Sequence, residues 1–384
     1  MTKQRILILG STGSIGQNCL EVLAAMQERF EVTGLAAGSQ WELLATQVNR
    51  WRPPHVAISD DDAQADLASA IPSGTRLLSG PDAMCDLVDS TDFDCVVVAV
   101  VGTAALSATI RAVERGKRVA IANKESLVVA GGLLVPLARR TGAELLPIDS
   151  EHSAVFQAMQ AGRACDVRRI VLTASGGPFR NWSPEQMDCA TVEDALNHPI
   201  WEMGPKVTID SATMMNKALE IVEARWLFGL HHDQIEVVIH PESIVHSLVE
   251  FVDGSMVAQL GTPDMRTPIQ YALTYPERLE CPSTRLDLTA IRQMNFYPPD
   301  IQKFPALRLG HEVAERGGTA GAVFNAANES AVQMFRDRAL GFSEITTTVE
   351  QVLTRHDWVA NPSFADLMRA DAWARNEVMR CTAC

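Results

Sequence analysis

Short apolar runs alternate with helix-like segments through the first 150 residues of this 384-residue chain. The runs cover residues 5–9, 31–37, 55–58, 95–101, 118–122 and 144–148. Successive strands separated by helices pair in parallel, because each helical crossover returns the chain to the same end of the sheet. The alternation therefore predicts a parallel, doubly wound α/β sheet, and we assign residues 1–149 to this domain.

The pattern changes after this domain. From about residue 165 to 260 it mixes α and β, with a hairpin expected over Val249–Gln259 and turned by Asp253-Gly254. Residues 276–305 contain five prolines, which favours an extended connector over packed structure. Helical patterns then cover Ala306–Arg316, Ala320–Arg336, Phe342–Arg355 and Pro362–Arg380. We expect an α+β domain over 150–275, a linker over 276–304 and a C-terminal α-helical domain over 305–384.

Composition excludes several classes of function. A net charge of −14 and a pI near 5.1 argue against binding nucleic acid or anionic membranes, which require a basic surface. No apolar stretch reaches membrane-spanning length. The start MTKQRILILG has only four apolar residues before its glycine, too few for the apolar region of a secretory leader. The eight cysteines are scattered, and the pair Cys381 and Cys384 lacks partners for a zinc site. We expect reduced thiols and a cytoplasmic protein.

The first chemical motif is a glycine-rich turn at Gly10, Gly13 and Gly16, between a strand and an amphipathic helix. Small residues there let a backbone approach a pyrophosphate at the helix N-terminus, although a plain tight turn would also hold glycines. After the second strand the chain reads Gly38-Ser39-Gln40, with no acidic residue to bind a ribose hydroxyl. The motif favours a dinucleotide, and the missing acid favours NADP.

Polar residues follow two later strands. Asn123-Lys124-Glu125 comes after the strand ending at Ala122, and Asp149-Ser150-Glu151 comes after Ile148. Strand ends of an open α/β sheet face its ligand crevice, so two acids there could hold a hard cation. Both groups have a structural alternative, since Asn123 or Asp149 could simply cap the helix that follows. His152 adjoins the acids but is set aside as a ligand, because carboxylates suffice for a hard ion.

Residues 210–228 form a predicted helix on which Asn216, Lys217 and Glu220 share one face. The ordinary interpretation is a solvated face with a Lys–Glu pair. Apolar residues surround these three, however, which indicates partial burial. Ser211 near the start of this helix, Ser175 in Ser175-Gly176-Gly177 and Lys217 are the residue types that bind phosphate.

Together these motifs resemble a known family. The segments GSTGSIG, NKES, LPIDSEH, SGGPFR, HPIWEMG, DSATMMNKALEIVEARWLF, HPESIVHS and GTPDMRTP follow the order of 1-deoxy-D-xylulose-5-phosphate reductoisomerases over the whole chain. The resemblance implies a Rossmann-like N-terminal domain, a connective catalytic domain and a C-terminal helical bundle. It also implies a homodimer that rearranges 1-deoxy-D-xylulose 5-phosphate, by retro-aldol cleavage and aldol rejoining, and reduces the product with NADPH to 2-C-methyl-D-erythritol 4-phosphate.

The resemblance also assigns roles to residues. Mg²⁺ or Mn²⁺ would be bound by Asp149, Glu151 and Glu220, and the catalytic residues would be Lys124, Glu151 and His198. Substrate would be bound by Lys124, Ser150, Glu151, Ser175, His198, Ser211, Asn216, Lys217 and Glu220. NADPH would be bound by Thr12, Gly13, Ser14, Ile15, Gly38, Ser39, Gln40, Asn123, Glu125 and Gly204. Many relatives carry a basic residue at the position of Ser39, so this chain departs from the family where the 2′-phosphate would bind.

The stretch His198–Pro205 resembles the family's mobile lid, which we place at about 197–206. Trp201 and Met203 within it could cover the site and exclude water. Two other functions remain open on the residues alone. An NADP-dependent dehydrogenase without isomerisation would not need three converging acids, and a redox-sensing nucleotide-binding regulator would need neither the acids nor a phosphate pocket.

Overall fold

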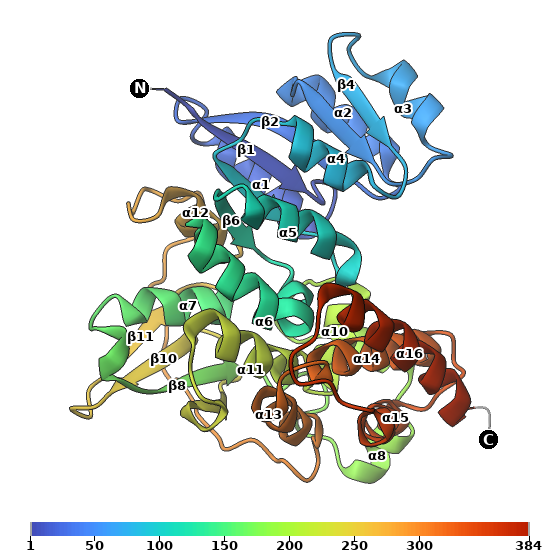
Figure 1. Cartoon of the computed structure of the whole chain (residues 1–384). Helices are drawn as coiled ribbons and strands as arrows, with labels where there is room; N and C mark the ends of the chain where they lie inside the picture. Colours follow the sequence, from blue (N-terminus) through green and yellow to red (C-terminus); the bar gives the residue numbers. More distant parts are fainter. Residues whose placement is uncertain (1, 383–384) are drawn as a thin grey trace. The chain divides into compact units, whose positions relative to one another are not determined.

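The computed structural model describes residues 2–382, so Cys384 of the terminal cysteine pair lies outside the described part (Figure 1). The chain divides into two compact units, each built from three stretches. The first unit contains residues 1–126, 134–153 and 264–284, and the second contains 127–133, 154–263 and 285–384.

The first unit is built on a seven-stranded parallel sheet in the order β4-β3-β2-β1-β5-β6-β7. Its strands are β1 (Gln4–Leu9), β2 (Phe30–Ala37), β3 (His55–Ile58), β4 (Arg76–Ser79), β5 (Cys95–Val98), β6 (Arg118–Ile121) and β7 (Leu145–Pro147). This confirms the parallel α/β prediction and its six strands. The edge strand β4 was missed because none of its residues is fully buried, and its sequence RLLS lacks a β-branched apolar run.

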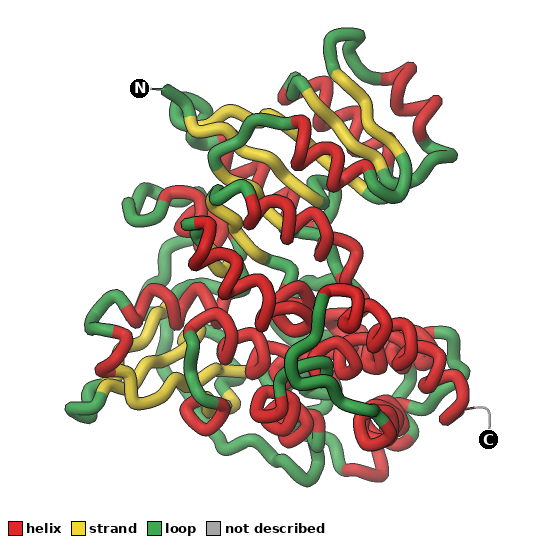
Figure 2. Tube along the Cα trace, viewed as in Figure 1, coloured by secondary structure: helices red, strands yellow, loops and turns green. Residues whose placement is uncertain are grey.

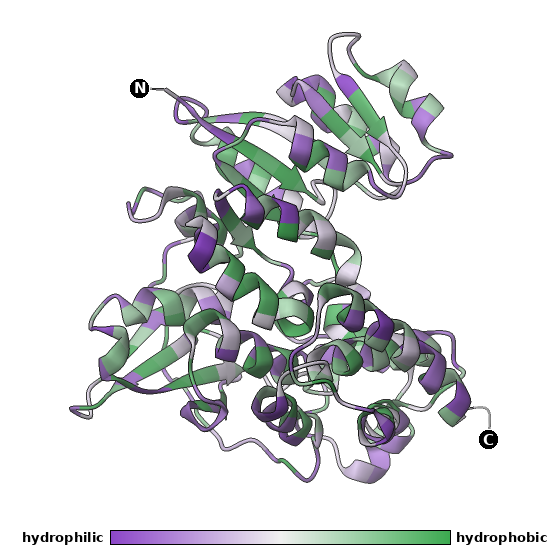
Figure 3. Cartoon of the chain, viewed as in Figure 1, coloured by the Kyte–Doolittle hydropathy of each residue, from purple (hydrophilic) through white to green (hydrophobic). Residues whose placement is uncertain are grey.

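Helices separate the strands, as Figure 2 shows. The helices between successive strands are α1 (Ser14–Ala24), α2 (Trp41–Trp51), α3 (Gln64–Ala70), α4 (Ala83–Ser90), η1 (Gly102–Ala105), α5 (Leu106–Glu114) and α6 (Lys124–Thr141). Two more, α7 (Ser150–Met159) and α12 (Arg266–Thr274), follow β7, and residues 127–133 of α6 and 154–159 of α7 belong to the second unit. Central strands are hydrophobic along their length in Figure 3, and all four residues of β5 are buried. Strands covered on both faces need such continuous apolar sequences.

The glycine-rich turn lies where the strand order reverses. After β1 the sheet extends through β2, β3 and β4 on one side, and β5, β6 and β7 extend it on the other. A side chain at Gly10 would lie 2.5 Å from the Ala99 carbonyl oxygen that follows β5. Open α/β sheets bind ligands at this switch point, beyond the carboxyl ends of the strands.

The second unit contains a four-stranded sheet in the order β11-β10-β8-β9. Its strands are β8 (Val167–Ala174), β9 (Ile235–Ile239), β10 (Val245–Phe251) and β11 (Met256–Leu260). β10 pairs antiparallel with β8 and β11, whereas β8 and β9 are parallel. The β10–β11 hairpin turns through Gly254, whose φ is +86°, which confirms the predicted hairpin.

Helices make up most of the remaining second unit. They are η2 (Ala164–Asp166), α8 (Pro184–Asp188), α9 (Val192–Leu196), α10 (Pro205–Ala212), α11 (Met215–Phe228), η3 (His232–Gln234), α13 (Ala306–Arg316), α14 (Ala320–Arg336), α15 (Phe342–Arg355) and α16 (Phe364–Thr382). The bounds of α13, α14 and α15 are those predicted from the sequence. α16 begins and ends two residues later than the predicted segment.

The predicted single helix over 210–228 is wrong. α10 ends at Ala212 and α11 begins at Met215, with Met214 between them in the left-handed conformation at φ +62°. The Thr213 hydroxyl accepts the Met215 N–H at 3.2 Å, which replaces a helical hydrogen bond and allows the break. Ser211 consequently lies in the last turn of α10 and not at the start of the next helix.

The proline-rich segment is irregular, as predicted, but its second half packs against the sheet of its own unit. Tyr297 forms an isolated antiparallel bridge with Ile239. Nδ1 of the buried His240 lies 2.8 Å from the Asn295 carbonyl oxygen. The His240 ring also stacks on Phe296, with ring centroids 4.6 Å apart. These contacts fix a segment for which the sequence predicted no packing.

Among residues 2–382, no helix combines the length and the apolar character that crossing a bilayer requires.

Candidate functional site

In the first unit, the turn after β1 is shaped for close approach of a ligand. A side chain at Gly16 would lie 2.3 Å from the Gly10 carbonyl oxygen, so only glycine allows α1 to begin so close to the strand. Gly13 caps α1, and no side chain accepts from the first-turn N–H groups there. Uncapped N–H groups at a helix start attract the phosphates of a nucleotide.

The next residues predicted to bind the cofactor lie in the turn after β1 and directly after the neighbouring strand β2. Thr12 is buried beside the exposed Gly13 and Ser14, with Ile15 half-buried at the start of α1. Gly38, Ser39 and Gln40 directly follow β2, the neighbour of β1, and are exposed.

One contributor to this turn was missed by the sequence analysis. Gln47 on α2 accepts the Ser11 hydroxyl at 2.7 Å and donates to the Ser11 carbonyl oxygen at 2.8 Å. This buried pair fixes the turn from the side of α2. A lone glutamine in a helix gives no signal of such a role in the sequence.

Asn123, Lys124 and Glu125 follow β6 and start α6. The Asn123 side chain accepts the Ser126 N–H at 3.0 Å, so the structural alternative of a helix cap is correct for Asn123. Its amide also donates to the Gly102 carbonyl oxygen at 2.8 Å. Lys124 pairs with Asp149 at 2.5 Å, and both side chains are largely buried, which ties the ends of β6 and β7 together.

The two acids after β7 converge. Carboxylate oxygens of Asp149 and Glu151 lie within 4.8 Å of each other, and the Ser150 hydroxyl donates to Glu151 at 2.5 Å. Asp149 also starts α7, because its carbonyl oxygen accepts the Ser153 N–H. A ring nitrogen of the buried His152 also lies within 4.8 Å of an Asp149 carboxylate oxygen.

In the second unit, Asn216, Lys217 and Glu220 share one face of α11, as predicted. The Asn216 amide donates to one Glu220 oxygen at 2.6 Å, and the Lys217 ammonium pairs with the other. Glu220 is fully buried and Lys217 nearly so, which rules out the solvated-face alternative. An ammonium and an amide directed at one carboxylate supply both of its oxygens with partners in the protein interior.

A hydroxyl-lined loop lies beside α10 in this unit. Ser175 directly follows β8, and its hydroxyl accepts the Gly177 N–H at 3.2 Å. Gly177 has a φ of +66°, and a side chain there would lie 2.5 Å from the Ser211 carbonyl oxygen. The loop and the last turn of α10 are therefore in backbone contact, which brings the segments of Ser175 and Ser211 together.

His198 is bound to the same loop, with Nε2 lying 3.0 Å from the Ser175 hydroxyl oxygen. Burial lowers the pKa of His198 below its ordinary value, so the ring is neutral at pH 7. A cavity of about 420 Å³ adjoins it, lined by residues that include Ser175, Gly177, Arg180, Asp194 and Ile200.

The expected lid has no regular secondary structure before α10 begins at Pro205. Trp201 is half-buried, with its ring centroid 6.3 Å from that of His246 on β10. Met203 is also half-buried, and Gly204 is the exposed N-cap of α10.

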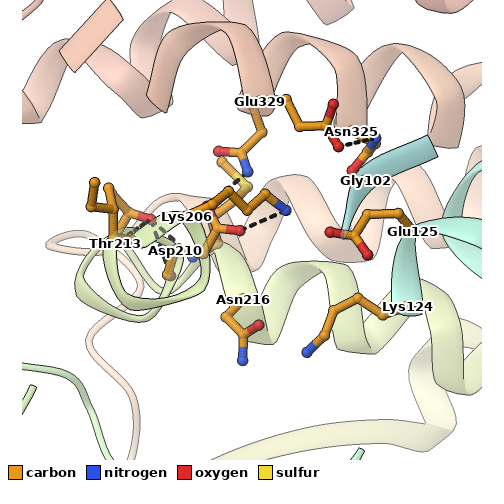
Figure 4. A network of polar contacts seen from close by, with 12 residues as sticks. Gly102, Lys124, Glu125, Lys206, Asp210, Thr213, Asn216, Asn325 and Glu329 are labelled. Atoms are coloured by element: carbon orange, nitrogen blue, oxygen red, sulfur yellow. Dashed lines mark hydrogen bonds and ion pairs between the residues drawn. The ribbon is translucent and has the colours of Figure 1, made fainter. Parts of the chain in front are cut away.

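A polar network behind α10 was not predicted. Lys206 pairs with Asp210 at 2.9 Å along α10, as Figure 4 shows, and Asp210 is 1% exposed. The Asn328 amide of α14 donates to Asp210 at 2.8 Å. Asn325, one turn before Asn328, is also fully buried and bonds to Glu329. Two asparagines three residues apart, separated by two alanines on α14, were the available signal.

The predicted residues thus form two groups, one in each unit. The cofactor turn, Lys124, Asp149 and Glu151 lie at the carboxyl edge of the parallel sheet. Ser175, His198, Ser211 and the Glu220 cluster lie in the second unit with Gly204. The fold and these groups define the class of dinucleotide-binding α/β enzymes that act on small anionic substrates.

Comparison with known proteins gives the particular family. Models of the 1-deoxy-D-xylulose 5-phosphate reductoisomerase family match residues 6–131, and its C-terminal domain models match 145–228 and 260–377. The reductoisomerase of Synechococcus sp. strain JA-2-3B'a(2-13) is 48% identical over 97% of this chain and 96% of the relative. The reductoisomerase of Chloroherpeton thalassium is 48% identical over 98% of this chain and 97% of the relative. The chain belongs to the 1-deoxy-D-xylulose 5-phosphate reductoisomerase family.

Solved structures agree. The Zymomonas mobilis reductoisomerase in complex with NADPH is 42% identical, with a TM-score of 0.93 over 99% of each chain. A reductoisomerase in complex with NADPH, fosmidomycin and magnesium is 39% identical, with a TM-score of 0.92 over 99% of this chain and 98% of the other.

Proposed function

We propose that the two groups of residues together carry out the reaction of the family. The protein is an oxidoreductase of isoprenoid biosynthesis that converts 1-deoxy-D-xylulose 5-phosphate to 2-C-methyl-D-erythritol 4-phosphate, with NADPH and a divalent metal ion. One structural observation carries the proposal. The nucleotide-type turn and a pair of carboxylates lie at the same edge of one parallel sheet, so a hydride donor and a cation would share one crevice.

NADPH would be held chiefly by the first unit. The cradle formed by Gly10 and Gly16 fits a pyrophosphate, because no side chain separates the strand end from the helix start. Residues 12–15 would contact the phosphates, 38–40 the adenosine ribose, and Asn123 and Glu125 the nicotinamide side. Gly204 would add a further contact.

Asp149, Glu151 and Glu220 would hold the metal ion. Three carboxylates suit Mg²⁺ or Mn²⁺, and Asn216 and Lys217 would hold the buried Glu220 carboxylate in place for this role. When bound, the ion supplies Lewis-acid polarisation of the substrate oxygens. Lys124, Ser150 and Glu151 would orient the sugar hydroxyls, with Lys124 and Glu151 positioned to move protons.

The second unit would bind the substrate phosphate. Ser175 and Ser211 offer hydroxyls, Asn216 an amide and Lys217 a positive charge, and His198 offers a ring N–H. This set also supplies the basic group that an anionic substrate needs in a protein of net charge −14. Trp201 and Met203 of the lid would exclude water while the aldehyde is reduced.

One assay tests this function against its alternatives. NADPH oxidation is followed on adding 1-deoxy-D-xylulose 5-phosphate with and without Mg²⁺, and the product is identified by NMR. We expect metal-dependent oxidation and a branched product. An unbranched reduced product would indicate a dehydrogenase without isomerisation, and absence of turnover with retained NADPH binding would indicate a regulator.

We further propose the domain roles expected from the sequence. Residues 1–149 bind NADPH, 150–275 hold the metal and substrate groups with a lid at about 197–206, 276–304 connect, and 305–384 form a helical domain. The packing of α14 against both α15 and α16 supports the last assignment.

A homodimer is also proposed, with β11 as its contact. β11 lies at the end of its sheet order, and Met256 and Leu260 on it are 48% and 37% exposed. An edge strand with apolar side chains offers unpaired backbone groups to a second copy. Light scattering should give twice the monomer mass of 41.8 kDa, and the double variant Met256→Lys, Leu260→Lys should give a monomer. A monomeric parent protein would reject the proposal.

Finally, we propose that the enzyme is cytoplasmic. The seven cysteines within the described residues are free, which fits a reducing compartment. Fractionation of cells that express the protein would test this, and activity in an extracytoplasmic fraction would contradict it.

A further inference from the structure

Both ring nitrogens of His198 are bonded, and the bonds determine where the proton lies. Nδ1 accepts the backbone N–H of Trp201 at 2.9 Å and that of Ile200 at 3.2 Å. A nitrogen that accepts two N–H groups carries no proton itself. The neutral ring is therefore protonated on Nε2, which donates to the Ser175 hydroxyl at 3.0 Å.

The Nδ1 bonds fold the lid locally. A side-chain acceptor at one residue that binds the N–H groups two and three residues later is the geometry by which short polar side chains organise a turn. Pro199 lies inside this turn, where it has no N–H to satisfy and a fixed φ. The backbone position of Trp201 is thus set by His198.

The Nε2 bond connects this turn to the phosphate-type pocket. Its partner Ser175 also accepts from Gly177, whose backbone packs against Ser211. One imidazole therefore touches the lid backbone through one nitrogen and the hydroxyl loop through the other.

We propose that His198 is a positioning residue with two separable tasks. Nδ1 organises the turn that places Trp201 over the site, and Nε2–H binds the hydroxyl loop that would contact the substrate phosphate. The second task rests on the phosphate pocket proposed above, whereas the first depends only on contacts within the lid.

Two variants separate the tasks. Asparagine reaches the position of Nδ1 and can accept the same backbone N–H groups, whereas glutamine reaches the position of Nε2 and can donate to Ser175. For His198→Asn we expect KM for 1-deoxy-D-xylulose 5-phosphate to rise by roughly three- to tenfold, because one hydrogen bond is lost. The kcat of this variant should be nearly unchanged. For His198→Gln we expect kcat to fall by a similar factor with KM nearly unchanged.

A spectroscopic readout follows the turn itself. The emission of Trp201, obtained by subtracting the spectrum of the matching Trp201→Phe protein, should keep its parent value in His198→Asn and change in His198→Gln. Lowering the pH protonates Nδ1 and should change this emission in the parent protein only below the ordinary pKa of histidine, because burial lowers the pKa of His198. Arg180 and Asp194 line the cavity beside the ring, and His246 faces Trp201, so His198→Asn serves as the pH control.

Ser175→Ala removes the partner of Nε2 and leaves the turn intact, so it should raise KM without changing Trp201 emission. It keeps the inference testable if His198→Gln does not fold. Equal losses of kcat and 1/KM in both histidine variants, or the same emission change in both, would overturn the inference. An unchanged KM in His198→Asn and Ser175→Ala would instead reject the phosphate pocket, and the emission comparison would still decide the turn.

Discussion

At the scale of single residues, the second unit buries a carboxylate within helix α11. Glu220 is completely buried, yet Asn216 and Lys217 satisfy both of its oxygens from the same face of α11. Burying a lone charge would cost several kcal/mol, so such an arrangement persists where the charge has a use. The proposed use is metal binding.

Glu220→Gln should preserve the fold and nearly abolish turnover. Glutamine has the same shape and still accepts from Lys217, but it removes a negative ligand, which should lower kcat by roughly 10²- to 10³-fold. Steady-state kinetics over a range of Mg²⁺ concentrations, with circular dichroism of the same sample, measure both effects. Glu236→Gln, a change to a half-exposed acid of β9 paired with Arg169, is the control. Parent-level activity in Glu220→Gln would disprove the three-carboxylate site.

Cofactor choice is also decided by single residues. Ser39 and Gln40 after β2 are exposed and carry neither the acid that selects NAD nor a cation for a 2′-phosphate. We expect NADPH to be preferred, because hydroxyl and backbone groups can donate to its 2′-phosphate. The measurement is kcat/KM with NADPH and with NADH. Ser39→Lys should increase the preference in a salt-dependent manner. Comparable kcat/KM with NADH in the parent protein would contradict the prediction.

At the scale of elements, the site depends on how closely loops and helices approach each other. The Ser175 loop touches α10 only because Gly177 has no side chain, and α10 is fixed from behind by Asn328 of α14. Two separate contacts thus position Ser211.

Gly177→Ala should weaken substrate binding. The added methyl would lie 2.5 Å from the Ser211 carbonyl oxygen, forcing the loop and helix apart, and KM should rise by roughly tenfold or more. Gly254→Ala is the matched control, because Gly254 also has a positive φ but open space around it. Both variants should lose about 1 kcal/mol of stability from the left-handed backbone. If both leave KM unchanged, the contact does not position the site.

Asn328→Ala removes the hydrogen bond to Asp210 and leaves a buried acceptor short of a partner. We expect a loss of about 1–3 kcal/mol in the free energy of unfolding, measured by urea denaturation, and a higher substrate KM. Asn376→Ala, on the exposed side of α16, should change neither quantity. Unchanged stability in Asn328→Ala would show that the network is dispensable.

How far the sequence predicts these elements depends on the range of the forces that form them. Apolar periodicity is local, so α13, α14, α15 and six parallel strands were predicted correctly. The break at Thr213–Met214 arises from one hydroxyl bond and a left-handed residue, which periodicity does not register. Likewise, Tyr297 and His240 are far apart in sequence from their partners, so their contacts could not be inferred from local patterns.

The same limit applies to the site. Chemical type and spacing predicted that Asn216, Lys217 and Glu220 share one helix face, and the structure confirms this because one helical turn brings them together. Gln47, Asp210 and Asn328 hold the proposed site segments from other elements, and their positions depend on tertiary packing.

At the scale of the whole molecule, ligands should be linked to stability. NADPH at 100 times its Kd should stabilise the folded protein by about 2.7 kcal/mol, visible as a higher unfolding midpoint in calorimetry. Gly16→Val should abolish this increase, because its side chain would fill the space between strand and helix. An equal increase with that variant would place the cofactor elsewhere.

The order of the chain in the first unit has a consequence for how the protein is made. α12 packs against α1, β6 and β7, and Arg118 donates to the Leu273 carbonyl oxygen at 3.2 Å. The stretch that supplies this helix, residues 264–284, is therefore translated long after the sheet that it covers. On the ribosome, about 110 further residues must be synthesised after the sheet, at 5–20 residues per second, before α12 can pack against it. Truncation before residue 284 should accordingly expose apolar surface in the nascent chain and recruit chaperones.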